Sequence, residues 1–165
     1  MKLTIRLIYF YLFAFSLFLL AISFLLQYGF HLQPCPLCII DRILVLLIVI
    51  CFVVALCHPS QKMGQRLYSL IAFLLCALGI LVTSRHLWLI HLPVNEVPAC
   101  SPSFNYLIET FPLKEALIII LKSSGECAVN TPAVLGLTLP AWTLMSFVLL
   151  AVGSLLPWWV KKDKQ

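Results

Sequence analysis

Charged side chains are scarce in this sequence. Asp, Glu, Lys and Arg make up 10% of its 165 residues, whereas hydrophobic residues make up 62%. A typical soluble protein carries about 25% charged residues, and a soluble domain of this length could not bury so much apolar side chain. The composition therefore excludes an ordinary soluble domain and predicts an integral membrane protein in contact with the lipid bilayer.

Several motifs of familiar chemistry are also missing. The net charge is +5, but no basic cluster alternates with aromatic residues, so we expect no nucleic acid among its partners. The sequence contains no haem-attachment motif, no glycine-rich dinucleotide fingerprint and no metal-cluster motif. Any redox chemistry must therefore use other side chains together with a diffusible molecule.

Four apolar runs are long enough to cross a membrane, for which about 20 residues are needed. They lie at residues 7–26, 39–57, 67–90 and 139–160. Lys2 and Arg6 precede the first run, as in a signal peptide, but this run is too long and no small-x-small cleavage site follows, so we expect an uncleaved anchor. The sequence predicts an all-α membrane protein, a single domain over residues 1–165 that forms a four-transmembrane-helix bundle.

The basic residues predict the orientation of these spans, because Lys and Arg mark the cytoplasmic side. If the spans alternate, one side receives Lys2, Arg6, Lys62, Arg66, Lys161, Lys162 and Lys164. Both termini are then cytoplasmic, and two extracytoplasmic loops, residues 29–38 and 92–138, face outward. In the second loop, the segment from Pro112 to Gly125 is expected to form a short helix, either on the membrane surface or packed against the protein.

The seven cysteines fall into two groups by position. Those within apolar runs are expected to be inert packing, since cysteine behaves there as a small hydrophobic residue; they are Cys51, Cys57 and Cys76. The remaining four lie in the outward loops; they are Cys35, Cys38, Cys100 and Cys127. In bacteria the outward side is the oxidising compartment, where disulfides form and persist.

Cys35 and Cys38 form a C-x-x-C pair at the mouth of the second span. Pro36 suits the first helical position, which places Cys35 at the cap and Cys38 in the first turn, where free amides favour a thiolate. Arg42 lies four residues after Cys38 on the same face and could stabilise negative charge on sulfur or on a reduced ligand. The alternative is an orientation anchor paired with Asp41. Adjacent residues point in different directions on a helix, and a charge inside a span is costly, so we favour a functional role.

Cys100 and Cys127 lie 27 residues apart in the second outward loop. A disulfide closing such a loop stabilises by about 3.5 kcal/mol in the chain-entropy model, so a structural staple is the simplest interpretation. A zinc site built from all four loop cysteines would need a second close pair, which is absent, and no metal site is predicted. Two dithiols on one face suggest instead an electron relay by thiol–disulfide exchange, for which a membrane-dissolved quinone is the remaining acceptor.

At "PCPLCIIDR", residues 34–42, the sequence resembles the DsbB family of quinone-dependent, disulfide-generating membrane proteins. The resemblance covers nearly the whole chain: four spans, a C-x-x-C pair entering the second, an arginine four residues later and two cysteines in the second outer loop. The stretches "SSGECA" (123–128) and "LGLTLPAW" (135–142) also resemble the family. The resemblance implies a multi-pass protein of the bacterial cell inner membrane with periplasmic redox cysteines.

The resemblance also implies a mechanism. A reduced periplasmic DsbA-like thiol oxidase would attack a Cys100–Cys127 disulfide, with Cys100 as the partner in the mixed disulfide. The electrons would pass to the Cys35–Cys38 pair through a transient Cys35–Cys100 link. Cys38 would then react with ubiquinone or menaquinone while Arg42 holds the charged state.

One further residue and several other functions stay open. His86 resembles a family histidine near the quinone, although Arg85 and His91 lie close by in the sequence and could serve instead. The alternatives are a dedicated disulfide oxidase for one specific partner and a structural four-helix membrane protein with stapling disulfides. A quinone epoxide reductase-like protein shares the bundle and the C-x-x-C pair, but its redox pair is expected late in the chain.

Overall fold

The computed structural model describes the backbone of most of the predicted spans and of parts of the second loop. The described residues are 2–29, 35–57, 62–92, 106, 109–112, 114–115, 118–119, 133–134 and 136–159. Four long helices dominate them: α1 (Lys2–Gly29), α2 (Pro36–Cys57), α3 (Lys62–Ile90) and α7 (Leu139–Trp159). All four are long and apolar enough to cross a membrane, which confirms the predicted fold class.

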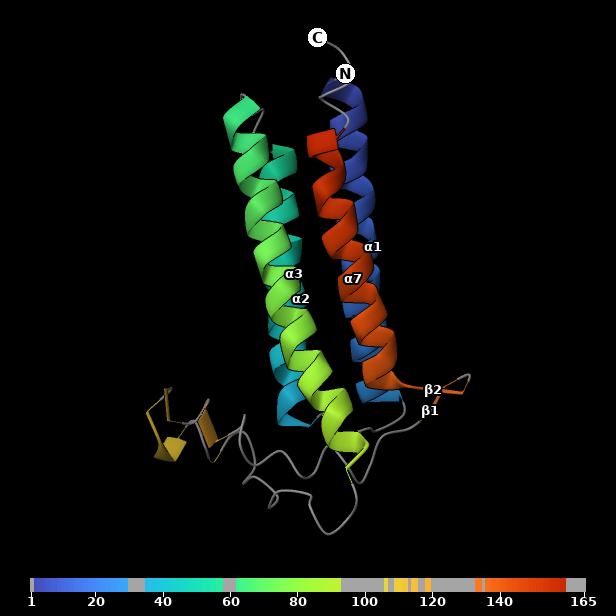
Figure 1. Ribbon diagram of the computed structural model, residues 1–165, viewed down its shortest axis with the longest axis vertical. Coiled ribbons are helices and arrows are strands. Elements are labelled where there is room, and N and C mark those ends of the chain that lie inside the picture. The colour runs from blue at the N-terminus through green and yellow to red at the C-terminus, as the bar shows by residue number, and fades with distance from the viewer. Residues whose placement is uncertain are drawn as a thin grey trace.

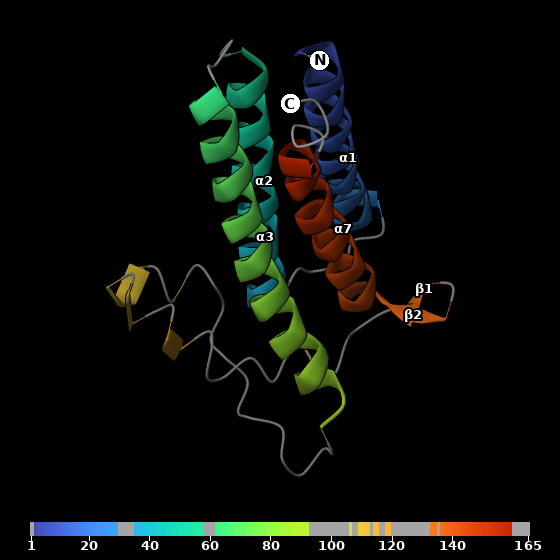
Figure 2. The same ribbon diagram turned by 45° about the horizontal axis from the view of Figure 1, so that its top comes forward.

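The four helices form a closed antiparallel bundle (Figures 1 and 2). Helix α1 packs against α2 and α7, while α3 packs against the same two neighbours and most extensively against α7. In Figure 1, α1 begins and α7 ends at one end of the bundle, whereas α2 begins and α3 ends at the other. The C-x-x-C pair at the start of α2 therefore lies at the same end as the last turns of α3.

The core is largely apolar, and so is the outer surface. Tyr9, Phe52 and Phe147 are almost completely buried and bring together α1, α2 and α7. On the outside, Leu25 and Leu81 are each 67% exposed. A water-soluble bundle would cover that face with charged groups, so these exposed side chains indicate contact with lipid.

The helices extend beyond the apolar runs that predicted them. Helix α1 begins at Lys2 and ends at Gly29, whereas the predicted span covered residues 7–26; α3 likewise begins at Lys62 rather than at 67. The criterion of an uncharged run marks the part of a helix that lies in hydrocarbon. It does not mark the end of the helix, because polar residues at the membrane interface can continue the backbone hydrogen bonding.

Two features precede α7. Strands β1 (Ala133–Val134) and β2 (Leu137–Thr138) form a short antiparallel hairpin, whose turn contains Gly136 with a φ of 82°, a backbone conformation that suits glycine. The sequence did not predict this hairpin. The surface helix predicted between Pro112 and Gly125 lies mostly outside the described residues, although Glu115 N donates to Pro112 O at 2.9 Å.

Candidate redox-active site

The site begins with the cap of α2. Pro36 is the first residue of the helix, as predicted, and Ile39 N donates to Cys35 O at 3.2 Å. The amide of Cys38 donates to Sγ of Cys35 at 3.3 Å, so Cys35 acts as the N-cap through its sulfur. This confirms the prediction that Cys35 occupies the cap, whereas the prediction that the free amides at the helix start favour a thiolate at Cys38 stays a prediction.

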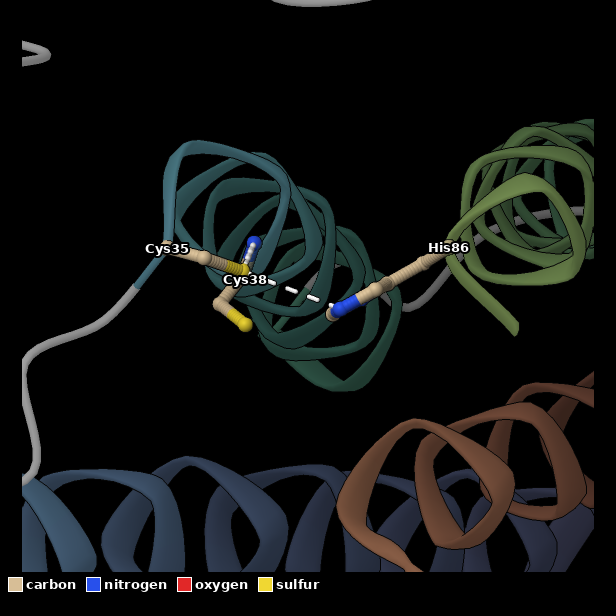
Figure 3. A group of neighbouring side chains, drawn as sticks. All are labelled: Cys35, Cys38 and His86. Carbon is tan, nitrogen blue, oxygen red and sulfur yellow. Dashed lines mark hydrogen bonds between the residues drawn. The ribbon is translucent and has the colours of Figure 1, made fainter. Parts of the chain in front are cut away.

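His86 of α3 completes a cluster with the two cysteines (Figure 3). Its Nε2 lies 3.8 Å from Sγ of Cys35, and the ligand atoms of Cys35, Cys38 and His86 all lie within 4.8 Å of one another. The His86 side chain is 1% exposed, and its Nδ1 has no hydrogen-bond partner among the described residues. The arrangement places an imidazole that can exchange a proton directly against a dithiol.

Apolar side chains surround this cluster. Leu37 and Leu89 are fully buried next to it, one from α2 and one from α3. Phe111 and Ile119, from described parts of the loop between α3 and α7, pack against the same pair of leucines. The second loop therefore contacts the end of the bundle that carries Cys35.

Asp41 and Arg42 point to different neighbours. The carboxylate of Asp41 is buried and faces α3, where the Thr83 hydroxyl lies 3.2 Å away. The guanidinium of Arg42 faces α1: its Nε donates to Ser23 Oγ at 2.6 Å, its NH2 donates to Ser23 O at 3.1 Å, and its NH1 donates to Gln27 Oε1. The prediction that these adjacent side chains point in different directions is confirmed.

The Arg42 side chain is held firmly, and Arg42 lies one helical turn after the dithiol on α2. Besides its hydrogen bonds, its guanidinium carbon lies 5.6 Å from the ring centroid of Phe24, in a cation–π contact. Among the described residues, its hydrogen bonds go to α1 and not to Cys38. The sequence alone missed these partners, although Ser23 and Gln27 are polar residues four apart in an otherwise apolar run, which places them on one helix face.

The alternatives to His86 differ from it in position. His91 is exposed at the end of α3, and its Nδ1 lies 2.8 Å from Leu87 O of the preceding turn. Arg85 has a buried Nε without a hydrogen-bond partner among the described residues. Of the three side chains, His86 is the one whose described contacts include a cysteine sulfur.

The other cysteines separate into two cases. Cys51 and Cys76 are buried between helices, as expected for packing, and Cys51 Sγ lies 3.5 Å from Tyr68 O. Cys57, at the end of α2, is exposed. Cys100 and Cys127 lie outside the described residues, so the disulfide between them stays a prediction.

The fold and this site together define an integral membrane protein of four helices with a dithiol at one mouth of the bundle. A family model matches residues 5–157, and its description is "Disulfide bond formation protein DsbB". The chain therefore belongs to the DsbB family. It is a multi-pass bacterial membrane protein of disulfide bond formation.

Individual relatives agree with this assignment. A protein of Nitrosococcus oceani named Disulfide bond formation protein B is 43% identical over 155 residues, which cover 94% of this chain and 92% of the relative. A protein of the same name from Methylococcus capsulatus is 41% identical over 147 residues, covering 89% and 90%. A third, from Hahella chejuensis, is 37% identical over 165 residues and covers 98% of both chains.

Proposed function

We propose that this protein is a quinone-dependent oxidoreductase that reoxidises a periplasmic DsbA-type thiol oxidase and passes the electrons to a membrane quinone. The observation that carries the proposal is the Cys35–Cys38 pair at a mouth of the bundle, with His86 against its sulfur. A dithiol in that position can exchange with a thiol outside the hydrocarbon and still meet a lipid-soluble oxidant. The family to which the chain belongs supports the same activity.

The proposed reaction has two halves that balance. In the first, two thiols of the reduced oxidase become a disulfide, and the Cys100–Cys127 disulfide of this protein becomes two thiols. Exchange with the Cys35–Cys38 disulfide then restores the Cys100–Cys127 disulfide and leaves Cys35 and Cys38 reduced. The packing of Phe111 and Ile119 against the leucines beside Cys35 supports a close approach of the second loop.

In the second half, the reduced pair becomes a disulfide again, and ubiquinone or menaquinone takes up two electrons and two protons. Each described side chain has a distinct part. The Cys35 sulfur is stabilised as an anion by the Cys38 amide, and His86 can accept or return a proton at Nε2. Arg42 of α2 is held by hydrogen bonds to α1 and lies one helical turn after the sulfurs. There it supplies positive charge for a reduced acceptor.

The acceptor's surroundings fit a quinone by their chemistry. The region combines apolar walls, represented by Leu37 and Leu89, with one cation and one imidazole. A quinone needs an apolar site for its ring and tail and a few polar groups for its oxygens. His86 and Arg42 are the described groups that could meet those oxygens.

The proposed orientation places both termini in the cytoplasm and the redox cysteines in the periplasm. The clustering of Lys and Arg near the termini and between the second and third helices supports it. The bundle supports it as well, since α1 begins and α7 ends at the end opposite the dithiol (Figure 1). Thiol labelling from outside intact cells tests this directly, and a Cys100 or Cys127 reachable only from the cytoplasm would overturn it.

The decisive assay combines the purified protein, a reduced DsbA-like partner and a quinone, with quinone reduction followed by absorbance. We expect Cys38→Ser to abolish quinone reduction and Cys57→Ser, a change at the exposed far end of α2, to leave it unchanged. Full activity in Cys38→Ser would overturn the mechanism. Unchanged electron transfer in Cys35→Ser would instead support a structural role. Complementation of a strain that lacks its own protein for reoxidising DsbA separates a general enzyme from a dedicated one.

A further inference from the structure

Cys35, Cys38 and His86, at the mouth of the bundle, together form a set of possible metal ligands. Disulfide chemistry does not require all three of these side chains to lie together. Two thiols from α2 and one imidazole from α3 present their ligand atoms within 4.8 Å of one another. We propose that the reduced Cys35–Cys38 pair and His86 together bind a thiophilic divalent cation, for which Zn²⁺ is the natural probe. This site differs from the four-cysteine zinc site that the sequence disfavours, because an imidazole takes the place of the second cysteine pair.

The separation of the Cys35 sulfur and the His86 ring nitrogen is close to what tetrahedral zinc requires. Bond lengths of about 2.3 Å to sulfur and 2.0–2.1 Å to nitrogen give ligand separations of about 3.6 Å between sulfur and nitrogen and about 3.8 Å between two sulfurs. The observed separation of Cys35 Sγ and His86 Nε2 is 3.8 Å. This pair would therefore have to close by only about 0.2 Å.

The electronic requirements are met as well. In the tautomer with the ring proton on Nδ1, His86 presents the lone pair of Nε2 to Cys35 Sγ at 3.8 Å, with Cys38 Sγ within 4.8 Å. Thiolate and imidazole are ligands that select zinc over magnesium and calcium. Binding would release one proton from each thiol, and water could occupy the fourth position, as in other three-ligand zinc sites.

Charge favours three ligands over four at this place. Two thiolates and one Zn²⁺ sum to zero, whereas four thiolates would leave two negative charges. The site lies beside the buried leucines Leu37 and Leu89, where an uncompensated charge is costly to desolvate. A neutral metal site is therefore compatible with the apolar mouth of the bundle.

Binding would have one consequence for the redox cycle. The metal needs both sulfurs as thiolates, so it binds the reduced pair, and a metal-bound pair cannot form its own disulfide. Zn²⁺ would thus hold the protein in its reduced state until a chelator removes it. This consequence rests on the proposed function, whereas the binding itself does not.

The test measures binding in a protein in which Cys100 and Cys127 are both replaced by Ser, so that they cannot supply ligands. The reduced protein is titrated with Co²⁺, whose thiolate charge-transfer and tetrahedral d–d absorption report the ligands, and with Zn²⁺ in competition with a chromophoric chelator. We expect one metal per chain and none after the Cys35–Cys38 pair is oxidised. No binding, or binding that survives oxidation, would overturn the proposal.

Matched variants assign the ligands. His86→Gln should weaken binding by about tenfold or more, since even changes outside the ligand set cost 10–100-fold. His91→Gln, a change at an exposed histidine just after the end of α3, should not weaken it. Cys57→Ser should likewise bind as the parent protein does. X-ray absorption at the zinc edge of the protein with Cys100→Ser and Cys127→Ser, which keeps His86, should count two sulfurs and one imidazole nitrogen. Coordination without imidazole, or equal affinity in His86→Gln, would contradict the proposal even if the quinone assay succeeds.

Discussion

The hydroxyl oxygen of Thr83 lies 3.2 Å from Oδ1 of Asp41, and this contact joins α3 to α2 in the interior of the bundle. Thr83 is completely buried and Asp41 is 6% exposed. The same hydroxyl lies 2.7 Å from Gly79 O in the preceding turn. A buried carboxyl group on a membrane-spanning helix is costly, so its partner across the helix interface contributes directly to the stability of the bundle.

Replacing Thr83 by Val removes the hydroxyl beside Asp41 and leaves the shape nearly unchanged. We expect a loss of about 1–3 kcal/mol in the free energy of unfolding, because the buried carboxyl group of Asp41 loses its hydrogen-bond partner. Unfolding of the purified protein in mixed detergent micelles measures this. Thr143→Val is the matched control, since Thr143 bonds only to Leu139 O of its own helix among the described residues, at 3.1 Å.

A double variant tests whether the unpaired carboxyl group of Asp41 causes this loss of stability. Asp41→Leu combined with Thr83→Val removes both polar partners, and we expect it to recover most of the stability lost in Thr83→Val alone, because no unpaired polar group is left. If Thr83→Val were as stable as the parent protein, the contact would have no energetic role.

The hold of α1 on Arg42 leads to a second prediction, for the proposed enzymatic activity. A lysine at this position keeps the charge but cannot donate to both Ser23 and Gln27 through a planar fork. We expect Arg42→Lys to raise the KM for quinone by about tenfold, which corresponds to about 1.4 kcal/mol of binding. Arg66→Lys, an exposed site near the start of α3, is the control and should behave as the parent protein does. An unchanged KM would show that the position of the charge is unimportant.

The sequence predicted those parts of this structure that depend on one helix at a time. Hydrophobic runs predicted the four spans, Pro36 predicted where α2 begins, and the geometry of adjacent helical residues predicted that Asp41 and Arg42 would diverge. Each of these follows from the chemistry of a local segment.

The sequence did not predict which side chains meet across two helices, or which backbone amide bonds to the cap residue. That Arg42 would find Ser23 on α1 depends on which helices are neighbours, and an apolar run does not encode that choice. The position of Cys35 at the cap was predicted, but the hydrogen bond from the Cys38 amide to the Cys35 sulfur was not, because the sequence does not show which first-turn amide the cap residue accepts from. The functional roles of the site residues all stay predictions; these residues are Cys35, Cys38, Arg42, His86, Cys100 and Cys127.

The cap geometry predicts unequal reactivity of the two cysteines. Cys35 Sγ accepts the Cys38 amide and faces His86, and both contacts favour its thiolate. We expect iodoacetamide to modify Cys35 several-fold faster than Cys38 in the reduced protein, as measured by mass spectrometry of timed samples. Cys57, exposed at the other end of α2, reports the rate of an ordinary thiol. Faster modification of Cys38 would contradict this order.

Gly79 allows α3 to approach α7 closely. A Cβ atom added at this position would lie 2.5 Å from Cε1 of Phe147, whose side chain is only 1% exposed. We expect Gly79→Ala to destabilise the bundle, because overpacking costs about 1–3 kcal/mol and outweighs the gain of up to about 1 kcal/mol from the helix preference of alanine. The measurement is again the free energy of unfolding in mixed micelles.

Two companion variants separate packing from helix propensity. Gly29→Ala introduces the same residue at the end of α1, where nothing lies within 4 Å of the added atom, and it should not reduce stability. Phe147→Leu combined with Gly79→Ala gives the new methyl group space, so the pair should be less destabilised than the two single changes together. Strict additivity would show that Gly79 and Phe147 do not limit how closely α3 and α7 pack.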